Sequence, residues 1–229
     1  ENIWTMKWSY QNNKQNWIIY MMCRTAAPQM IPSEGVKNLW NTEEYRVDLR
    51  RYQTIDTTIV YASNHISSPN GDASIWKWQP GERVIEANEK YVPFYRYADI
   101  LLLRAEALNK QQRQEEALEL LNMIRERAGL SLKTMDDFTN ASDRTLAMED
   151  AILQERQLEL LGEGRRWFDL IRTGRAMKVM NDYFENYIEQ VTYAPALQMN
   201  GSFTGRYIII IFWKTRIWFK MVIIKKIQM

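Results

Sequence analysis

The sequence has 229 residues, of which 46% are hydrophobic and 25% charged, a composition that excludes a disordered or collagen-like protein and allows a buried core. The 30 basic residues nearly cancel the 28 acidic ones, so the bulk charge offers no field that would attract nucleic acid or an anionic membrane, and a neutral ligand is the better expectation. With one cysteine, Cys23, and one histidine, His65, the chain cannot form an internal disulfide or the usual zinc sites, and we expect neither a metal nor a cofactor.

Residues 1–92 are predicted to be rich in loops, with a few short strands. Their apolar runs are short and are interrupted by turn-forming residues, namely Pro28, Pro32, Pro69, Asn70-Gly71 and Pro80-Gly81. The opening residues 3–10 alternate apolar and polar positions, which is typical of a half-buried strand.

Residues 93–190 are predicted to be helical, beginning with a pair of antiparallel helices. Pro93 suits a first helical turn, and the apolar residues after it recur at helical spacing: Phe94, Ala98, Leu101, Ala105 and Leu108. A second helix is expected at about residues 114–128, with Gly129 as its C-terminal cap, and the polar link between the two predicts a hairpin. The small and large apolar residues repeat the spacing of a tetratricopeptide unit, which needs stacked neighbours, so we expect further helices upstream or downstream.

Three more helices are expected in the same part of the chain. The first runs from about Leu146 to Leu161 with Asp143 as its cap, the second from Arg166 to Thr173, and the third over residues 176–189. The predicted fold class is therefore mainly α, with tetratricopeptide-like helical hairpins, loop-rich irregular regions and a few short strands.

Three segments are similar, in their order and spacing, to the SusD/RagB family: YRYADILLLRAEALN from Tyr95, LLNMIRERAGL from Leu120 and ILQERQLELLGEGRRWFDLIRTG from Ile152. The opening ten residues and the stretch YRVDLRR around Asp48 and Arg50 resemble weaker landmarks of the family. The resemblance covers residues 1–206, as the C-terminal portion of a family member.

This resemblance implies a non-enzymatic lipoprotein, exposed at the cell surface on the outer membrane of Bacteroidetes-type bacteria. Such a protein captures oligosaccharides, or peptides in some members, and delivers them to a TonB-dependent transporter of the SusC type. No covalent bond is made or broken. The signal and the lipidated cysteine that the resemblance implies are expected outside this chain.

The charged residues of the third segment predict a structural ion-pair cluster. Glu155 and Glu159 lie on or beside the apolar stripe of their helix, and buried carboxylates need partners. Nearby arginines are close enough in sequence to provide them. The predicted cluster comprises Glu155, Arg156, Glu159, Arg165, Arg166 and Arg172.

A glycan site is predicted in the turns before Tyr95, where aromatic and amide side chains occur together. Aromatic rings can stack on the C–H faces of sugars, while amide and guanidinium groups hydrogen-bond hydroxyls. The candidate residues are Trp40, Asn64, Asn70, Trp76, Trp78 and Arg83. The alternative is that the sequence WKW at residues 76–78 is a strand with both rings on a core face.

Two other functional classes remain open at this point. A glycoside hydrolase would need a pair of carboxylates, and no motif selects one among the 28 acidic residues. A tetratricopeptide-like protein-interaction module without glycan binding is the principal alternative, because such helix pairs often form peptide-binding surfaces.

Residues 207–229 form an atypical tail. Family members tend to end in a segment like NPNLxQNPGY, whereas this chain ends in an apolar run interrupted by lysines and arginines. That run is too often charged to cross a membrane. Back-translation in another frame yields a family-like ending, so we interpret the tail as a possible frameshift product beginning near Tyr207.

Overall fold

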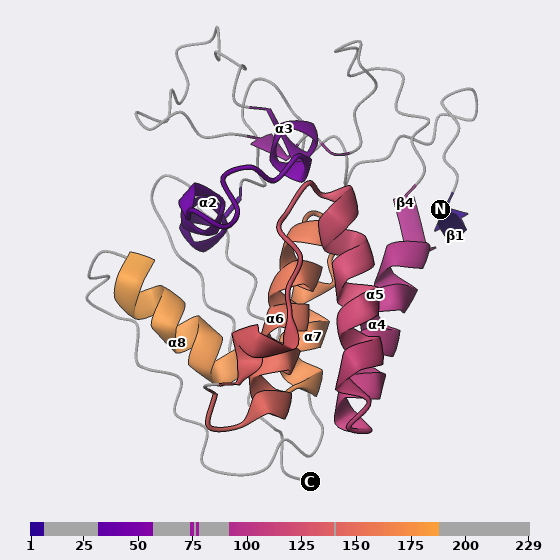
Figure 1. Ribbon diagram of the computed structural model, residues 1–229. Helices are drawn as coiled ribbons and strands as arrows, with labels where there is room; N and C mark the ends of the chain where they lie inside the picture. The colour runs from indigo at the N-terminus through magenta and orange to yellow at the C-terminus, as the bar shows by residue number, and fades with distance from the viewer. Residues whose placement is uncertain (7–31, 57–73, 76, 78–91, 140, 188–229) are drawn as a thin grey trace, which may run out of the picture. The chain divides into compact units, whose positions relative to one another are not determined.

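The computed structural model describes residues 1–6, 32–56, 74–75, 77, 92–139 and 141–187 (Figure 1). Its elements in chain order are β1 (Asn2–Met6), α2 (Glu34–Asn41), α3 (Arg50–Thr54), β2 (Ile55–Asp56), β3 (Ser74–Ile75), β4 (Val92–Arg96), α4 (Tyr97–Lys110), α5 (Gln114–Arg127), η2 (Met135–Phe138), α6 (Arg144–Glu159), α7 (Arg166–Arg172) and α8 (Ala176–Tyr187). The fold is mainly α, as the sequence predicts. The short strands pair in two antiparallel ribbons, β1 with β4 and β2 with β3.

The predicted hairpin is formed by α4 and α5, and α6 packs against both (Figure 1). Ala105 and Ala117 are fully buried between them, and these small side chains let the helix axes approach closely. Four residues of the predicted stripe lie in the main core, whereas Phe94 lies in β4. The main core consists of Ala98, Leu101, Leu102, Ala105, Leu108, Ala117, Leu118, Leu121, Ile124, Phe138, Met148 and Ile152.

The start of the hairpin differs from the prediction, because α4 begins at Tyr97 rather than at Pro93. Residues 92–96 are instead strand β4, in which Pro93 pairs with Thr5 of β1. A proline has no N–H to donate, and a two-stranded ribbon tolerates it because each strand has an open edge. The pairing partner is far away in the sequence, so the local pattern favoured helix.

The end of α5 has the glycine cap that the sequence predicts. Gly129 has a φ of +73°, its amide donates to Glu126 O at 3.0 Å, and the amide of Leu130 donates to Arg125 O at 2.9 Å. These two bonds are those of a Schellman motif, which satisfies the last carbonyls of a helix. The turn also brings Leu49 against Gly129, where an added Cβ would lie 3.1 Å from the Leu49 side chain.

The first part of the chain contains more helix than the sequence analysis expects. In α2 the Ser33 side chain accepts a hydrogen bond from Val36 N, and Val36 and Trp40 face inward at helical spacing. These inward residues belong to a second core: Val36, Trp40, Tyr45, Ile55, Ala128, Leu130 and Leu158. The loop prediction was therefore wrong for residues 34–41, where a capping serine and an i, i+4 apolar pair indicate a helix.

The last described helices largely follow the predicted ones. Asp143 caps α6 by accepting from Leu146 N at 3.0 Å, but the helix ends at Glu159, before Leu161. The expected domain boundary at residue 206 and the expected frameshifted tail at residues 207–229 lie outside the described residues, so both stay predictions.

Candidate functional site

Trp40 is the one predicted glycan-binding residue that the structure describes, and it is only 1% exposed. Its indole Nε1 donates a hydrogen bond of 3.1 Å to Asp48 Oδ2 inside the second core. A ring that is enclosed in this way has no face available for a sugar. The prediction that Trp40 binds a glycan is therefore wrong, because its helix turns the ring into the core.

The other predicted ligand residues lie outside the described residues: Asn64, Asn70, Trp76, Trp78 and Arg83. Two described neighbours lie close to them in sequence. Ile75 is 5% exposed, and the ammonium group of Lys77 donates to Glu163 Oε1 at 2.6 Å.

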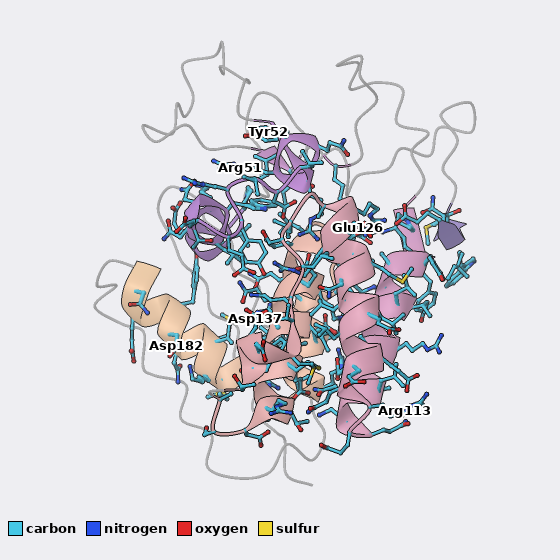
Figure 2. All side chains as sticks on the ribbon, viewed as in Figure 1. Arg51, Tyr52, Arg113, Glu126, Asp137 and Asp182 are labelled. Atoms are coloured by element: carbon cyan, nitrogen blue, oxygen red, sulfur yellow. The ribbon has the colours of Figure 1, made fainter. Side chains whose placement is uncertain are left out.

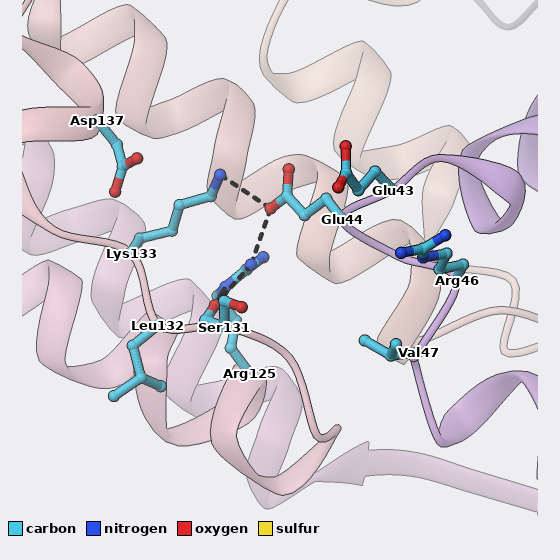
Figure 3. Close-up of a pocket in the computed structure, with 9 residues that line it drawn as sticks. All are labelled: Glu43, Glu44, Arg46, Val47, Arg125, Ser131, Leu132, Lys133 and Asp137. Atoms are coloured by element: carbon cyan, nitrogen blue, oxygen red, sulfur yellow. Dashed lines mark hydrogen bonds and ion pairs between the residues drawn. The ribbon is translucent and has the colours of Figure 1, made fainter.

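A pocket of about 560 Å³ lies between the turn after α2 and the segment after α5 (Figure 3). Figure 3 shows Arg125 and Lys133 reaching the same carboxylate, Glu44. The pocket is lined by Glu43, Glu44, Arg46, Val47, Arg125, Ser131, Leu132, Lys133 and Asp137.

Three of the charged side chains in this pocket are paired with one another, namely Glu44, Arg125 and Lys133. Glu44 Oε1 lies 2.8 Å from both Arg125 Nη2 and Lys133 Nζ. Partial burial acts to raise the pKa of Glu44, but the Lys133 and Arg125 contacts outweigh it and lower that pKa. Arg125 also donates to Ser131 O and to the Tyr45 hydroxyl, so its guanidinium is held by the protein itself. Sequence analysis missed this pocket, because its two walls are about eighty residues apart in the chain.

Beneath the pocket lies a buried network of charges that begins at Glu155, which is 0% exposed. Its Oε1 lies 2.7 Å from Arg50 Nη2, and its Oε2 lies 3.1 Å from Arg125 Nη1. Burial nevertheless raises the pKa of Glu155. Arg50 also lies 2.7 Å from Asp48 Oδ2, so the network reaches the carboxylate that holds Trp40.

One helical turn later, Glu159 is surrounded by cations. Its Oε1 lies 3.0 Å from Arg96 Nη1 and 2.6 Å from Arg127 Nη2. Burial acts to raise the pKa of Glu159, but Lys77, Arg127 and Arg96 outweigh it and lower the pKa to about 2. Glu163 completes this group by accepting from both Arg96 and Lys77. These ion pairs thus connect β4 and Lys77 to the end of α6.

A second buried group connects α4, α6 and α7. Arg156 lies 2.8 Å from both Asp99 Oδ1 and Asp169 Oδ2. Arg172 lies 2.8 Å from Asp169 Oδ1 and also donates to Glu106 Oε2 at 2.7 Å.

The remaining two arginines of the predicted cluster make weaker polar contacts. Arg165 Nε lies 3.7 Å from Asp99 Oδ2, and Arg166 Nη1 donates to the backbone carbonyl of Leu153 at 2.9 Å. The pairing within the cluster therefore differs from the prediction. Glu155 and Glu159 are neutralised by arginines of distant segments, whereas the nearby arginines contact α4, α6 and α7.

The side chains of the described residues are drawn together in Figure 2.

This arrangement holds charges in place and offers little for acid–base chemistry. The buried carboxylates Glu155 and Glu159 are each bonded to at least two cations. Among the described residues, we find no group of three or more histidine, cysteine, aspartate or glutamate side chains placed to hold a metal ion. No helix in the described ranges has the length and apolarity that a membrane crossing requires.

Comparison with known proteins identifies the family of this chain. The model of the SusD family matches residues 4–203, which is most of the chain and includes all three segments described above. The chain belongs to the SusD family. Its helical hairpin, its α6–α7 segment and the β1–β4 ribbon are therefore parts of a SusD-family fold.

Curated SusD-like proteins of Formosa agariphila are similar to this chain. SusD-like protein P38 is 53% identical over 89 residues, which is 38% of this chain and 18% of that protein. SusD-like protein P2 is 31% identical over 173 residues, which is 67% of this chain and 32% of that protein. The chain thus spans less than a third of the length of these relatives.

Two solved structures are also similar to parts of this chain. Surface glycan-binding protein A of Bacteroides thetaiotaomicron, solved in complex with laminarihexaose, is 26% identical over 66% of this chain and 33% of that chain, with a TM-score of 0.46. A SusD superfamily protein of Bacteroides fragilis is 16% identical over 74% of this chain and 40% of that chain, with a TM-score of 0.48.

Proposed function

We propose that this chain is part of a surface lipoprotein that captures oligosaccharides and delivers them to a TonB-dependent, SusC-like transporter in the outer membrane. The observation that carries the proposal is the SusD-family match over residues 4–203. Capture of a nutrient at the cell surface is the role that the family resemblance implies.

The two buried glutamates of α6 are better suited to a structural role than to a catalytic one. A general acid needs a pKa near the working pH, whereas the pKa of Glu159 is about 2. Its carboxylate, like that of Glu155, is held by arginines inside the protein. These glutamates therefore support the positions of other segments and are not offered to a substrate.

We propose Trp76 and Trp78 as the rings that contact the sugar, with Asn64, Asn70 and Arg83 as hydrogen-bonding neighbours. Their aromatic rings can stack on the C–H faces of sugars, while amide and guanidinium groups can hydrogen-bond the hydroxyls. The described residues next to them are held by the protein, since Ile75 is buried and Lys77 is bonded to Glu163.

The test is a titration of the full chain with neutral hexasaccharides of β-1,3-, β-1,4- and α-1,4-linked glucose, followed by calorimetry. We expect one of them to bind, and we expect Trp76→Ala and Trp78→Ala each to weaken its affinity about tenfold, the loss of one ring contact. Tyr52→Ala is the matched control, because Tyr52 is 72% exposed and projects from α3 (Figure 2). Unchanged affinity in both tryptophan variants would remove them from the site.

Delivery to a transporter has a separate test. Affinity purification of the tagged protein from its native outer membrane is expected to recover a TonB-dependent transporter in roughly equal amount. Recovery of a different protein, together with no glycan binding, would instead support the interaction-module alternative.

A further inference from the structure

Exposed aromatic side chains gather on the ribbon formed by β1 and β4. Trp4 is 59% exposed and Tyr95 is 43% exposed, and Tyr97, which follows β4 as the first residue of α4, is 52% exposed. Trp4 and Tyr95 are cross-strand partners, and their ring centroids lie 6.3 Å apart with an interplanar angle of 22°. Phe94 lies closer still to Trp4, with a centroid distance of 4.7 Å. Large exposed rings that lie nearly parallel are an unusual surface feature in a soluble domain.

These rings are held in place by the rest of the structure. The guanidinium carbon of Arg165 lies 5.0 Å from the centroid of the Tyr95 ring, which it therefore supports from one side. The amide of Tyr97 donates to Glu1 O at 2.9 Å and extends the ladder beyond β4. A surface that is fixed before binding loses little conformational entropy when a ligand arrives.

We infer that this aromatic face is a carbohydrate-contact surface for a neutral oligosaccharide, in addition to the two tryptophans proposed above. The apolar C–H face of one sugar ring packs on Trp4, and the next ring of the same chain reaches Tyr95. Tyrosine hydroxyls and the exposed Asn2 are available for the sugar hydroxyls. The inference rests on the proposed function, since it assigns a further part of the protein to the same class of ligand.

The charges around the ribbon favour an uncharged ligand. Arg165 faces Asp99 at 3.7 Å, and Arg127 lies 2.8 Å from Glu1 Oε1 and 2.6 Å from Glu159 Oε1. Because these described cations already face carboxylates, they leave little free charge to attract a charged partner. Aromatic rings beside internally neutralised charges suit the mixed apolar and hydroxyl surface of a neutral sugar.

The experiment uses the full chain and the three glucose hexasaccharides named above. Trp4→Ala and Tyr95→Ala are each expected to weaken the best ligand about tenfold, whereas Trp4→Tyr, which keeps a ring, retains most of the affinity. Tyr52→Ala serves again as the matched exposed aromatic on another element. Circular dichroism melts of each variant check that the fold is intact, which the exposure of Trp4 leads us to expect.

The outcomes separate this inference from the proposed function. If Trp4→Ala binds like the wild type while the Trp76 and Trp78 variants lose affinity, the ribbon is not a glycan surface and the proposed function stands. If Trp4→Ala keeps its glycan affinity but no longer copurifies with a protein partner, the ribbon is a protein contact and the inference is overturned. If the wild type binds none of the glycans, the inference and the glycan-capture proposal both fail.

Discussion

The indole nitrogen of Trp40 donates a hydrogen bond of 3.1 Å to Oδ2 of Asp48, and the two residues are 1% and 0% exposed. The same carboxylate lies 2.7 Å from Arg50, which in turn lies 2.7 Å from Glu155. A line of polar contacts therefore joins α2 to α6. It explains why Trp40 of α2 belongs to the core and does not contact a ligand.

Replacement of Trp40 is expected to affect stability and not ligand binding. Trp40→Ala leaves a cavity and should lower the free energy of unfolding by about 3–5 kcal/mol. Trp40→Phe keeps most of the ring but removes a donor to buried Asp48, at a cost of about 1–3 kcal/mol. Urea denaturation followed by circular dichroism measures both losses. A variant with native stability and lost glycan affinity would show that Trp40 contacts the ligand.

Loss of the buried pairing of Glu155 with Arg50 and Arg125 should destabilise the protein more than loss of an exposed ion pair. Glu155→Gln removes the negative charge that Arg50 and Arg125 share, while Asp48 and Glu44 still pair with these arginines, and is expected to lower the free energy of unfolding by about 1–3 kcal/mol. Glu116→Gln is the matched control, because Glu116 pairs with Arg113 at the exposed start of α5. We expect no measurable loss there. Equal losses in the two variants would contradict the structural role of the network.

Glu159 should make the fold sensitive to acid. Its pKa in the folded state, about 2, lies below its ordinary value of 4.5, so its stabilising contribution is complete above pH 4.5 and is lost as the pH falls toward 2. The contribution is on the order of 3 kcal/mol.

Chemical denaturation of the wild type and of Glu159→Gln between pH 2 and pH 6 measures this effect. The difference between the two proteins should shrink as the pH falls, and comparing them removes the opposing influence of Glu155, whose pKa is raised. A difference that stays constant with pH would show that Glu159 does not titrate as expected.

The glycine cap of α5 offers a matched pair of substitutions. Gly129 and Gly174 have φ angles of +73° and +71°, so an alanine costs about 1 kcal/mol at either position. Only at Gly129 would the new methyl group also meet a neighbour, the Leu49 side chain at 3.1 Å. Thermal melts should therefore show the larger loss for Gly129→Ala. A larger loss for Gly174→Ala would mean that the Leu49 contact is unimportant.

Local signals in the sequence identify the helical part well. The hairpin of α4 and α5 follows from apolar residues at helical spacing, and its end follows from Gly129, because both signals act within a few residues. The predicted start of α4 was wrong because the contact that decides it is distant in the sequence. Residues 92–96 are a strand only because β1, about ninety residues earlier, pairs with them.

The buried charged residues were also predictable only in part. The sequence indicated that Glu155 and Glu159 need cationic partners, because they lie beside an apolar stripe. It did not identify Arg50 or Arg96, which are 109 and 63 positions from Glu159. The nearer arginines, such as Arg156, face α4 and α7 instead. Partners at such separations depend on the fold and carry no local pattern.

The most direct test of the account is to incubate the full chain with its best-binding hexasaccharide and to measure binding and the fate of the sugar in the same sample. Calorimetry reports the affinity, and mass spectrometry of the recovered sugar reports its length. The account predicts saturable binding and recovery of the intact hexasaccharide after prolonged incubation. Shortened products would contradict non-catalytic capture, and the absence of binding to any oligosaccharide offered would contradict the proposal that the protein captures glycans.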